Sequence, residues 1–124
     1  MNSFFPPKGK HLLLDLSNCT KPLLNDAAEV ELILKQVAEE SGATIVSSFI
    51  HQFKPVGVSG VIVIQESHLS IHTWPEEGFA SFDFYSCGDS VDLEGSVERL
   101  VKAFEGEIHE MKIIDRGFVP SDHD

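Results

Sequence analysis

The sequence predicts an α+β fold, a two-layer sandwich with two helices on one face of a mostly antiparallel sheet. Two segments carry apolar residues at helical spacing, and the segments around them are short, rich in β-branched and aromatic residues, and separated by turns. The order strand, helix, strand occurs in each half of the chain, although residue-level repetition is too weak to indicate a duplication. Amphipathic helices and hairpin-connected strands are typical of a two-layer sandwich, because each helix must bury its apolar stripe against the sheet.

The first elements follow from local signals. Residues 1–8 contain two prolines and read as a loose arm, and the apolar run His11–Leu16 predicts a strand. Asn25 or Asp26 caps the first helix, and Gly42 ends it, because glycine accepts the left-handed conformation common at helix ends. The apolar stripe of this helix consists of Val30, Ile33, Leu34, Val37 and Ala38.

Three strands and two turns occupy the middle of the chain. Residues 43–53 are rich in β-branched and aromatic side chains and predict a strand, which the turn at 54–57 ends. A continuous apolar run at 60–65 predicts a buried strand. Residues 70–74 alternate and form the next strand, and a turn follows at 75–78.

The last third repeats the pattern. Residues 79–87 predict a strand, Ser90 caps the second helix, and Gly106 ends it before a final strand at 108–115. The polar tail at 119–124 is expected to fray. The second helix has an apolar stripe of Leu93, Val97, Leu100, Val101 and Phe104.

The strand at 79–87 has two different faces. Its apolar side chains Ala80, Phe82 and Phe84 alternate with Ser81, Asp83, Tyr85 and Cys87. The sheet face opposite the helices therefore carries many of the reactive side chains. That face needs partial cover, which predicts a homodimer.

Composition limits the classes of function. A chain of 124 residues with 42% hydrophobic content predicts a single domain over residues 1–124. Its net charge of −11 disfavours nucleic-acid binding through a general basic surface and mildly favours a cationic ligand. No segment reaches the roughly 18 apolar residues needed to span a bilayer, and no secretory signal is recognised. Cys19 and Cys87 are expected to be free thiols, and the protein to be cytoplasmic.

The run Gln65–Glu76, Q-E-S-H-L-S-I-H-T-W-P-E, is the most informative segment. It places Ser67 directly after Glu66, with His72 five positions later. A single serine usually bonds a nearby backbone group. A serine in this setting can instead attack a substrate, or the carbonyl of its own preceding residue, which needs no catalytic triad.

Together with Gly57-Val58-Ser59-Gly60 and Ser86-Cys87-Gly88, this run closely resembles the short prokaryotic form (class 1B) of S-adenosylmethionine decarboxylase. The resemblance extends from about residue 9 to residue 117. It implies that the Ser67 hydroxyl attacks the Glu66 carbonyl, and that β-elimination from the resulting ester leaves a pyruvoyl group. The products would be a β chain, 1–66, and an α chain, 67–124. The enzyme would make decarboxylated S-adenosylmethionine, the aminopropyl donor for spermidine.

The resemblance also implies individual roles. Ser59 supplies a hydrogen bond during cleavage, and His72 is the base, which suits a side chain that titrates near neutrality. Cys87 protonates the α-carbon after carbon dioxide leaves, since an unperturbed thiol is protonated at neutral pH. The pyruvoyl group derived from Ser67 is the whole cofactor. It forms a Schiff base with the substrate amine and accepts the electrons released by decarboxylation.

In the same family Trp74 corresponds to a residue that stacks on adenine, Glu76 to one that holds the ribose hydroxyls, and Phe53 to a contribution from the neighbouring protomer. Without the resemblance, these residues read as two core aromatics and a turn carboxylate. Glu77 departs from the tyrosine common there. An extra acid near the substrate would favour a free amine, so a pyruvoyl-dependent ornithine or arginine decarboxylase is an alternative.

Two other classes of function compete. His68 and His72, with His51 or Cys87, could supply zinc ligands, but residues four apart on a strand are separated by roughly 13 Å, too far for one ion. An uncleaved, non-catalytic binding or regulatory homologue is the second. It has no chemical need for the full set of Ser59, Ser67, His72 and Cys87.

Overall fold

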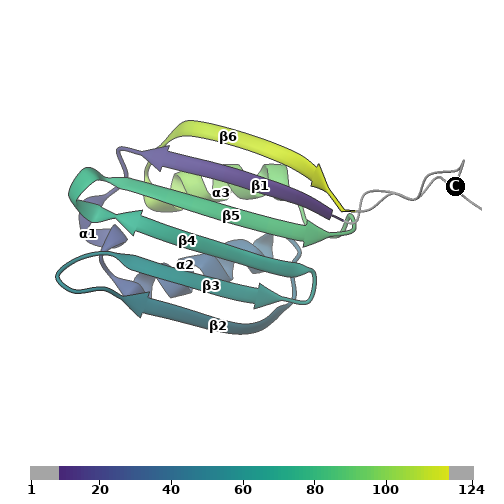
Figure 1. The fold of residues 1–124 in the computed structure, drawn as a ribbon, viewed down its shortest axis with the longest axis horizontal. Helices are drawn as coiled ribbons and strands as arrows, with labels where there is room; N and C mark the ends of the chain where they lie inside the picture. Colours follow the sequence, from purple (N-terminus) through teal and green to yellow (C-terminus); the bar gives the residue numbers. More distant parts are fainter. Residues whose placement is uncertain (1–8, 118–124) are drawn as a thin grey trace, which may run out of the picture.

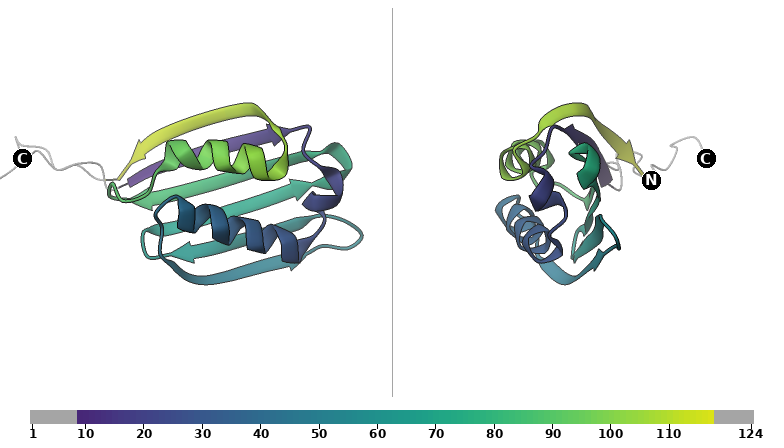
Figure 2. Two further views of the ribbon diagram at one scale, coloured as in Figure 1. Left: turned by 180° about the vertical axis from the view of Figure 1, so that it is seen from behind. Right: turned by 90° about the vertical axis from the view of Figure 1, so that its left-hand side faces the viewer.

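A single six-stranded sheet and two main helices make up the fold in the computed structural model, which describes residues 9–117 (Figure 1). The elements in chain order are β1 (Gly9–Ser17), α1 (Lys21–Leu24), α2 (Ala27–Glu40), β2 (Ile45–Gln52), β3 (Val58–Ile64), β4 (Ser67–Trp74), the 3₁₀ turn η1 (Pro75–Glu77), β5 (Phe79–Cys87), α3 (Leu93–Phe104) and β6 (Glu107–Arg116). The strand order is β2-β3-β4-β5-β1-β6, and every neighbouring pair is antiparallel. Helices α2 and α3 lie side by side across one face, and the other face is bare (Figure 2). The predicted fold class is confirmed.

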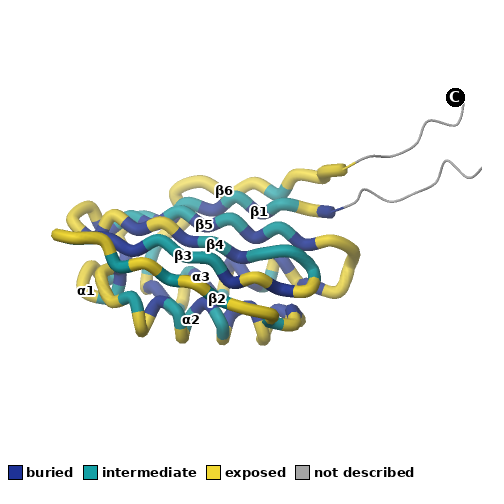
Figure 3. Tube along the Cα trace, turned by 60° about the horizontal axis from the view of Figure 1, so that its bottom comes forward, coloured by how far each residue is buried: buried dark blue, intermediate teal, exposed yellow. Residues whose placement is uncertain are grey.

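The core fills the space between the helices and the sheet. Buried residues alternate with residues of intermediate exposure along β1 and β5, while the edge strands β2 and β6 contain no buried residue (Figure 3). The largest fully buried side chains are Phe82, Phe84, Phe104, Leu12, Leu14, Leu16, Leu24, Leu34, Ile62, Leu69, Ile71 and Leu100. Because one face of the sheet is buried in this core, the register of each strand decides which side chains lie on the bare face.

The helix ends confirm one prediction and correct two. Asp26 caps α2, where its carboxylate accepts from the Glu29 amide at 3.1 Å. For α3 the cap is Asp92, which accepts from the Gly95 amide at 3.0 Å; the prediction of Ser90 was wrong. The N-cap is the residue directly before the first helical residue, here Leu93, and its side chain bonds the amide two or three positions later; Ser90 lies too early.

The C-terminal end of α3 differs from the prediction by one residue. Glu105, not Gly106, is the left-handed residue that ends the helix, with φ of 55°. Glycine is needed at 106 because a Cβ there would lie 2.7 Å from the Cys19 sulfur and 3.2 Å from the Ser17 carbonyl oxygen. A close approach of two segments therefore explains Gly106.

The β3–β4 hairpin is tighter than the sequence indicated. Ile64 pairs with Ser67, so only Gln65 and Glu66 form the turn, and β4 begins at Ser67 instead of Ser70. The Glu66–Ser67 bond thus lies at the corner of a hairpin. The short helix α1 was not predicted, and the expected arm at 1–8 and tail at 119–124 lie outside the described residues.

Candidate functional site

The bare face of the sheet carries polar and aromatic side chains at both ends of β4. Along this strand, Leu69, Ile71 and Thr73 are buried, and the residues between them point to the bare face. The predicted common face of Ser70, His72 and Trp74 is confirmed. We call the hairpin corner with Glu66, Ser67 and Cys87 the Ser67 end, and the opposite end, with Ser59, His72 and Trp74, the His72 end.

At the Ser67 end the peptide bond between Glu66 and Ser67 is held on several sides. The Cys87 amide donates to the Glu66 carbonyl at 2.8 Å. The Glu66 carboxylate accepts from the Thr44 amide at 3.1 Å, and the Gln65 amide donates to the Thr44 carbonyl at 2.9 Å. A backbone N–H aimed at a carbonyl oxygen stabilises negative charge that develops there during attack. The Cys87 amide thus occupies the position of an oxyanion-hole donor for this bond.

Ser67 itself has an unusual backbone conformation. Its φ is 152°, a value that L residues rarely adopt, and strained conformations of this kind cost on the order of 1–3 kcal/mol. Such strain raises the free energy of the folded chain at this position. The side chain of Cys87 is exposed at the end of β5, beside this bond.

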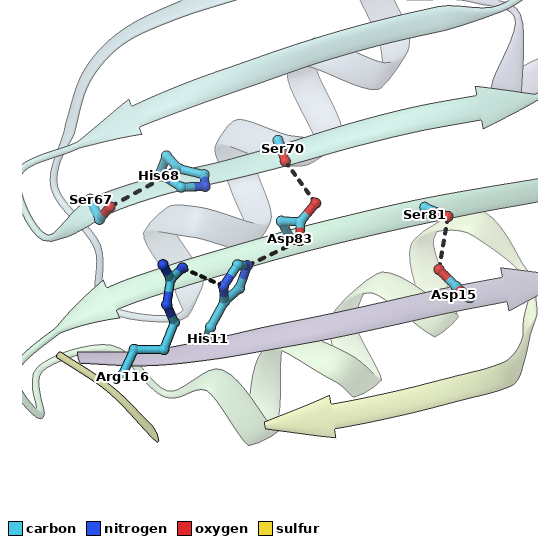
Figure 4. Close-up of polar contacts among 8 residues, drawn as sticks. All are labelled: His11, Asp15, Ser67, His68, Ser70, Ser81, Asp83 and Arg116. Carbon is cyan, nitrogen blue, oxygen red and sulfur yellow. Dashed lines mark hydrogen bonds and ion pairs between the residues drawn. The ribbon is translucent and has the colours of Figure 1, made fainter. Parts of the chain in front are cut away.

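His68 lies against Ser67 and is half-buried. The Ser67 hydroxyl and His68 Nδ1 are 3.2 Å apart, as drawn in Figure 4. Sequence reasoning considered His68 only as a metal ligand. Neighbouring residues on a regular strand point to opposite faces, so adjacency gave no reason to expect this contact. The contact occurs where the backbone at Ser67 departs from regular strand geometry.

Beside His68 lies a group of charged and polar side chains that are hydrogen-bonded to one another across β5, β1 and β6 (Figure 4). Tyr85 pairs with His68 across the strands, and their rings are 6.2 Å apart. His11 bonds Asp83 through Nε2 at 3.0 Å and faces Arg116 through Nδ1 at 2.9 Å. The Arg116 guanidinium lies 4.9 Å from the centre of the Tyr85 ring. Three strands, β1, β5 and β6, therefore place charge beside the Ser67 end.

This surrounding lowers the pKa of His68. Burial is the largest cause, the charge of His11 is the next, and Arg116 adds to it, while Asp83 opposes them. The imidazole of His68 is therefore held in its neutral form at neutral pH, in which one ring nitrogen can accept a proton.

At the His72 end, Ser59 and His72 face each other across β3 and β4. The Ser59 hydroxyl is 2.8 Å from His72 Nδ1, and His72 is exposed. Trp74 and Phe53 are 44% and 46% exposed, and Glu76 is exposed in η1, directly after Trp74. The residues that sequence analysis assigned to the base and to substrate binding thus gather at this end.

The two ends do not meet within one chain. Ser67 and His72 lie five positions apart on an extended strand, so their Cα atoms are separated by about 16 Å. The structure brings Ser67 beside the Cys87 backbone and Ser59 beside His72. It does not bring His72 within reach of Ser67.

Metal-ligand clusters, cavities and apolar helices were the other kinds of site considered in the described residues. Across residues 9–117, no three His, Cys, Asp or Glu side chains are grouped so that they could hold a metal ion. A cavity of about 200 Å³ beside the start of α3 is lined by Lys10, Ser86 and Asp92, among others, and by none of the predicted substrate-binding residues. None of the helices in this range is long and apolar enough to cross a membrane.

The two thiols differ in their surroundings. Both are free, as expected. Burial raises the pKa of the Cys19 thiol to about 11. Cys87 is instead exposed at the Ser67 end. Cys19 packs in the core beside the Ser17 backbone. Of the two, only Cys87 is placed to react.

Comparisons of the sequence and of the fold with known proteins all find the same enzyme family. The family model of S-adenosylmethionine decarboxylase matches residues 10–117. A proenzyme of that name from Thermodesulfovibrio yellowstonii is 43% identical over 111 residues, which are 90% of this chain and 82% of the relative. One from Thermotoga petrophila is 50% identical over 99 residues, 80% of this chain and 76% of the relative. The crystal structure of adenosylmethionine decarboxylase from Aquifex aeolicus superposes with a TM-score of 0.86 at 29% identity, covering 95% of this chain and 98% of the other. The chain belongs to the S-adenosylmethionine decarboxylase family.

Proposed function

We propose that this chain is an S-adenosylmethionine decarboxylase that makes its own pyruvoyl cofactor by cleaving the Glu66–Ser67 bond. One observation carries the proposal. The Glu66 carbonyl, at a hairpin corner, accepts a hydrogen bond from the Cys87 amide, while the next residue is a serine with φ of 152°. Oxyanion stabilisation, a nucleophile and a strained backbone thus coincide at one peptide bond.

The residues of the two ends together suit each step of the cleavage. Attack by the Ser67 hydroxyl converts the amide to an ester, and the Cys87 amide holds the negative charge that develops on the Glu66 oxygen. Removal of the Ser67 Cα proton by His72 of a second copy of the chain then breaks the ester, with Ser59 of that copy bonded to the imidazole. The pyruvoyl group so formed supplies a ketone that binds the substrate amine and accepts the electrons released with carbon dioxide. The Cys87 thiol returns a proton to the α-carbon.

The separation of the two ends supports a homodimer with shared active sites. A two-fold axis between two facing sheets, running across the strands, would place the Ser67 end of one chain over the His72 end of the other. Facing sheets pack about 10 Å apart, which side chains can bridge. Phe49 and Val63, 67% and 40% exposed on the same bare face, would be covered in this arrangement.

The substrate proposal depends on the His72 end. Trp74 and Phe53 present exposed aromatic faces, which suit an adenine ring and attract a sulfonium by cation–π interaction. Glu76 follows directly and suits the ribose hydroxyls. The same turn exposes Glu77, a second carboxylate that favours the distal cation of ornithine or arginine as the alternative substrate.

Intact-mass measurement and a substrate competition test this function. We expect two fragments, one ending at Glu66 and one beginning with a group that reacts with carbonyl reagents and resists N-terminal sequencing. Carbon dioxide release should then be measured from S-adenosylmethionine, ornithine and arginine in competition. A single intact chain without carbonyl reactivity would support the uncleaved homologue. Preference for a basic amino acid would reassign the substrate while keeping the chemistry.

A further inference from the structure

His68 is the side chain in contact with the reacting hydroxyl. Its Nδ1 lies 3.2 Å from the Ser67 oxygen, whereas His72, assigned to the later proton abstraction, is about 16 Å along the same strand. Attack by Ser67 requires removal of its hydroxyl proton. A base within hydrogen-bond reach of that proton is the first requirement for general-base catalysis.

We propose that His68 is a catalytic residue of self-cleavage, the base that accepts the Ser67 hydroxyl proton in the amide-to-ester step. This role rests on the proposed function, because it has a purpose only if the Glu66–Ser67 bond rearranges. It differs from the role of His72, which acts on the Cα proton after the ester has formed.

The step balances in atoms and protons. The bond from the Ser67 oxygen to the Glu66 carbonyl carbon forms as the hydroxyl proton moves to His68 Nδ1. The bond from that carbon to the nitrogen of residue 67 then breaks, and the imidazolium returns the proton to this nitrogen as it becomes a free amine. The step is an isomerisation that consumes no oxidant, reductant or water. It requires the His68 tautomer with its proton on Nε2.

The charges around His68 suit a neutral base. His11 faces it from β1, Tyr85 and Asp83 from β5, and Arg116 from β6. Its partner on β3 is Val63, which carries no charge, and its own strand adds the hydroxyls of Ser67 and Ser70. Burial, His11 and Arg116 lower the pKa of His68. The base is therefore present at neutral pH and is lost as the pH falls through this lowered value.

The central experiment follows the conversion of freshly synthesised chain to fragments in a cell-free system, sampled over time and separated on denaturing gels. His68→Asn keeps a hydrogen-bond acceptor near the Nδ1 position but cannot take up a proton. We expect cleavage to slow by about 100-fold, within the range of a lost general base. The uncleaved chain should resist hydroxylamine, because it stops before the ester. His72→Ala should instead accumulate a chain that hydroxylamine cleaves.

Matched controls separate catalysis from folding. His109→Asn makes the same change at an exposed histidine of β6 and should mature at the wild-type rate. Added imidazole should restore cleavage to His68→Gly, which a purely structural role would not allow. Wild-type cleavage by His68→Asn, or its arrest at the ester, would overturn the assignment of His68. Failure of the wild-type chain to cleave would overturn self-cleavage itself and is distinguishable from both.

A variant that leaves His68 in place gives a second test. Arg116→Gln removes a positive charge that lowers the pKa of His68, so that pKa rises. The acid limb of the cleavage rate should then move to higher pH, with the rate on the alkaline plateau unchanged. An unshifted pH profile would contradict the proposed role of His68.

Discussion

The two ends of the bare sheet face differ in what they hold and in how well they are enclosed. The Ser67 end holds the bond proposed for cleavage, with a half-buried histidine and charged side chains from β1, β5 and β6. The His72 end holds a hydrogen-bonded serine–histidine pair among exposed aromatic side chains. β4 holds the two ends apart by the length of a strand. In the proposed homodimer each end is therefore a half-site, which the opposite end of a second copy completes.

Ser67→Ala should have the largest effect, because no hydroxyl remains to attack the Glu66 carbonyl. We expect cleavage to stop completely while the fold is retained, since Ser67 is not part of the core. Mass spectrometry should show one intact chain with no carbonyl reactivity. Any cleavage in this variant would show that another nucleophile acts at this end.

Complementation between two inactive variants tests directly whether the two ends of different chains form one site. Chains with Ser67→Ala and chains with His72→Ala should each fail to mature alone. In the proposed dimer, co-expression gives heterodimers in which one shared site combines an intact Ser67 with an intact His72. The His72→Ala chain should therefore be cleaved, as judged by differential tags on a gel.

The control for complementation is co-expression of two variants whose substitutions lie at the same end of the sheet face. Ser59→Ala with His72→Ala should not restore cleavage, because each shared site then lacks one member of the hydrogen-bonded pair. Equal failure of both combinations would indicate that each site lies within a single chain.

Cys87→Ala should impair turnover more than maturation, because the backbone amide that bonds Glu66 survives the substitution. Loss of a general acid typically slows a reaction by on the order of 100-fold. Misplaced protonation should also leave the substrate amine on the cofactor and inactivate the enzyme during turnover. Carbon dioxide release and carbonyl content, followed together over time, measure both effects. Full activity without inactivation would remove the thiol from the mechanism.

Glu76→Gln should affect the fewest steps, because its effect is confined to substrate binding at the His72 end. Loss of charge-assisted hydrogen bonds to ribose costs roughly 1.5–3 kcal/mol each, or about 10- to 150-fold in affinity. Maturation should be unchanged, and KM for S-adenosylmethionine should rise. Glu77→Tyr is the matched variant in the same turn. If it reversed a preference for ornithine or arginine, the acidic turn and not the adenosyl pocket would set the specificity.

Much of the fold could be predicted because it depends on local pattern. The apolar periodicity of α2 and α3 and the alternation of β5 specify which face each element buries. The prediction failed where two local signals compete, as at Ser90 and Asp92, since both residues can cap a helix. It failed again at Gly106, where a neighbouring segment, not the helix end, requires glycine.

The candidate site, like the fold, was predictable in part from the sequence. The motif around Ser67 and the candidate residues Ser59, His72 and Cys87 could be identified from residue types and order alone. Their pairing could not, because it depends on strand register. Ser59 meets His72 only because β3 and β4 pair in one specific alignment, and the two-residue turn puts the Glu66–Ser67 bond under the Cys87 amide.

By itself, the sequence determined the fold class, the bond proposed for cleavage and the residue types available for the chemistry, because these depend on periodicity and on neighbours along the chain. Only the tertiary structure decided which of those residues meet. It placed His68 against Ser67 in a network with His11, Asp83 and Arg116, and it separated Ser67 from His72 by the length of a strand. The physical reason is that distances across a sheet follow from pairing and register, whereas distances along a strand follow from its fixed rise per residue.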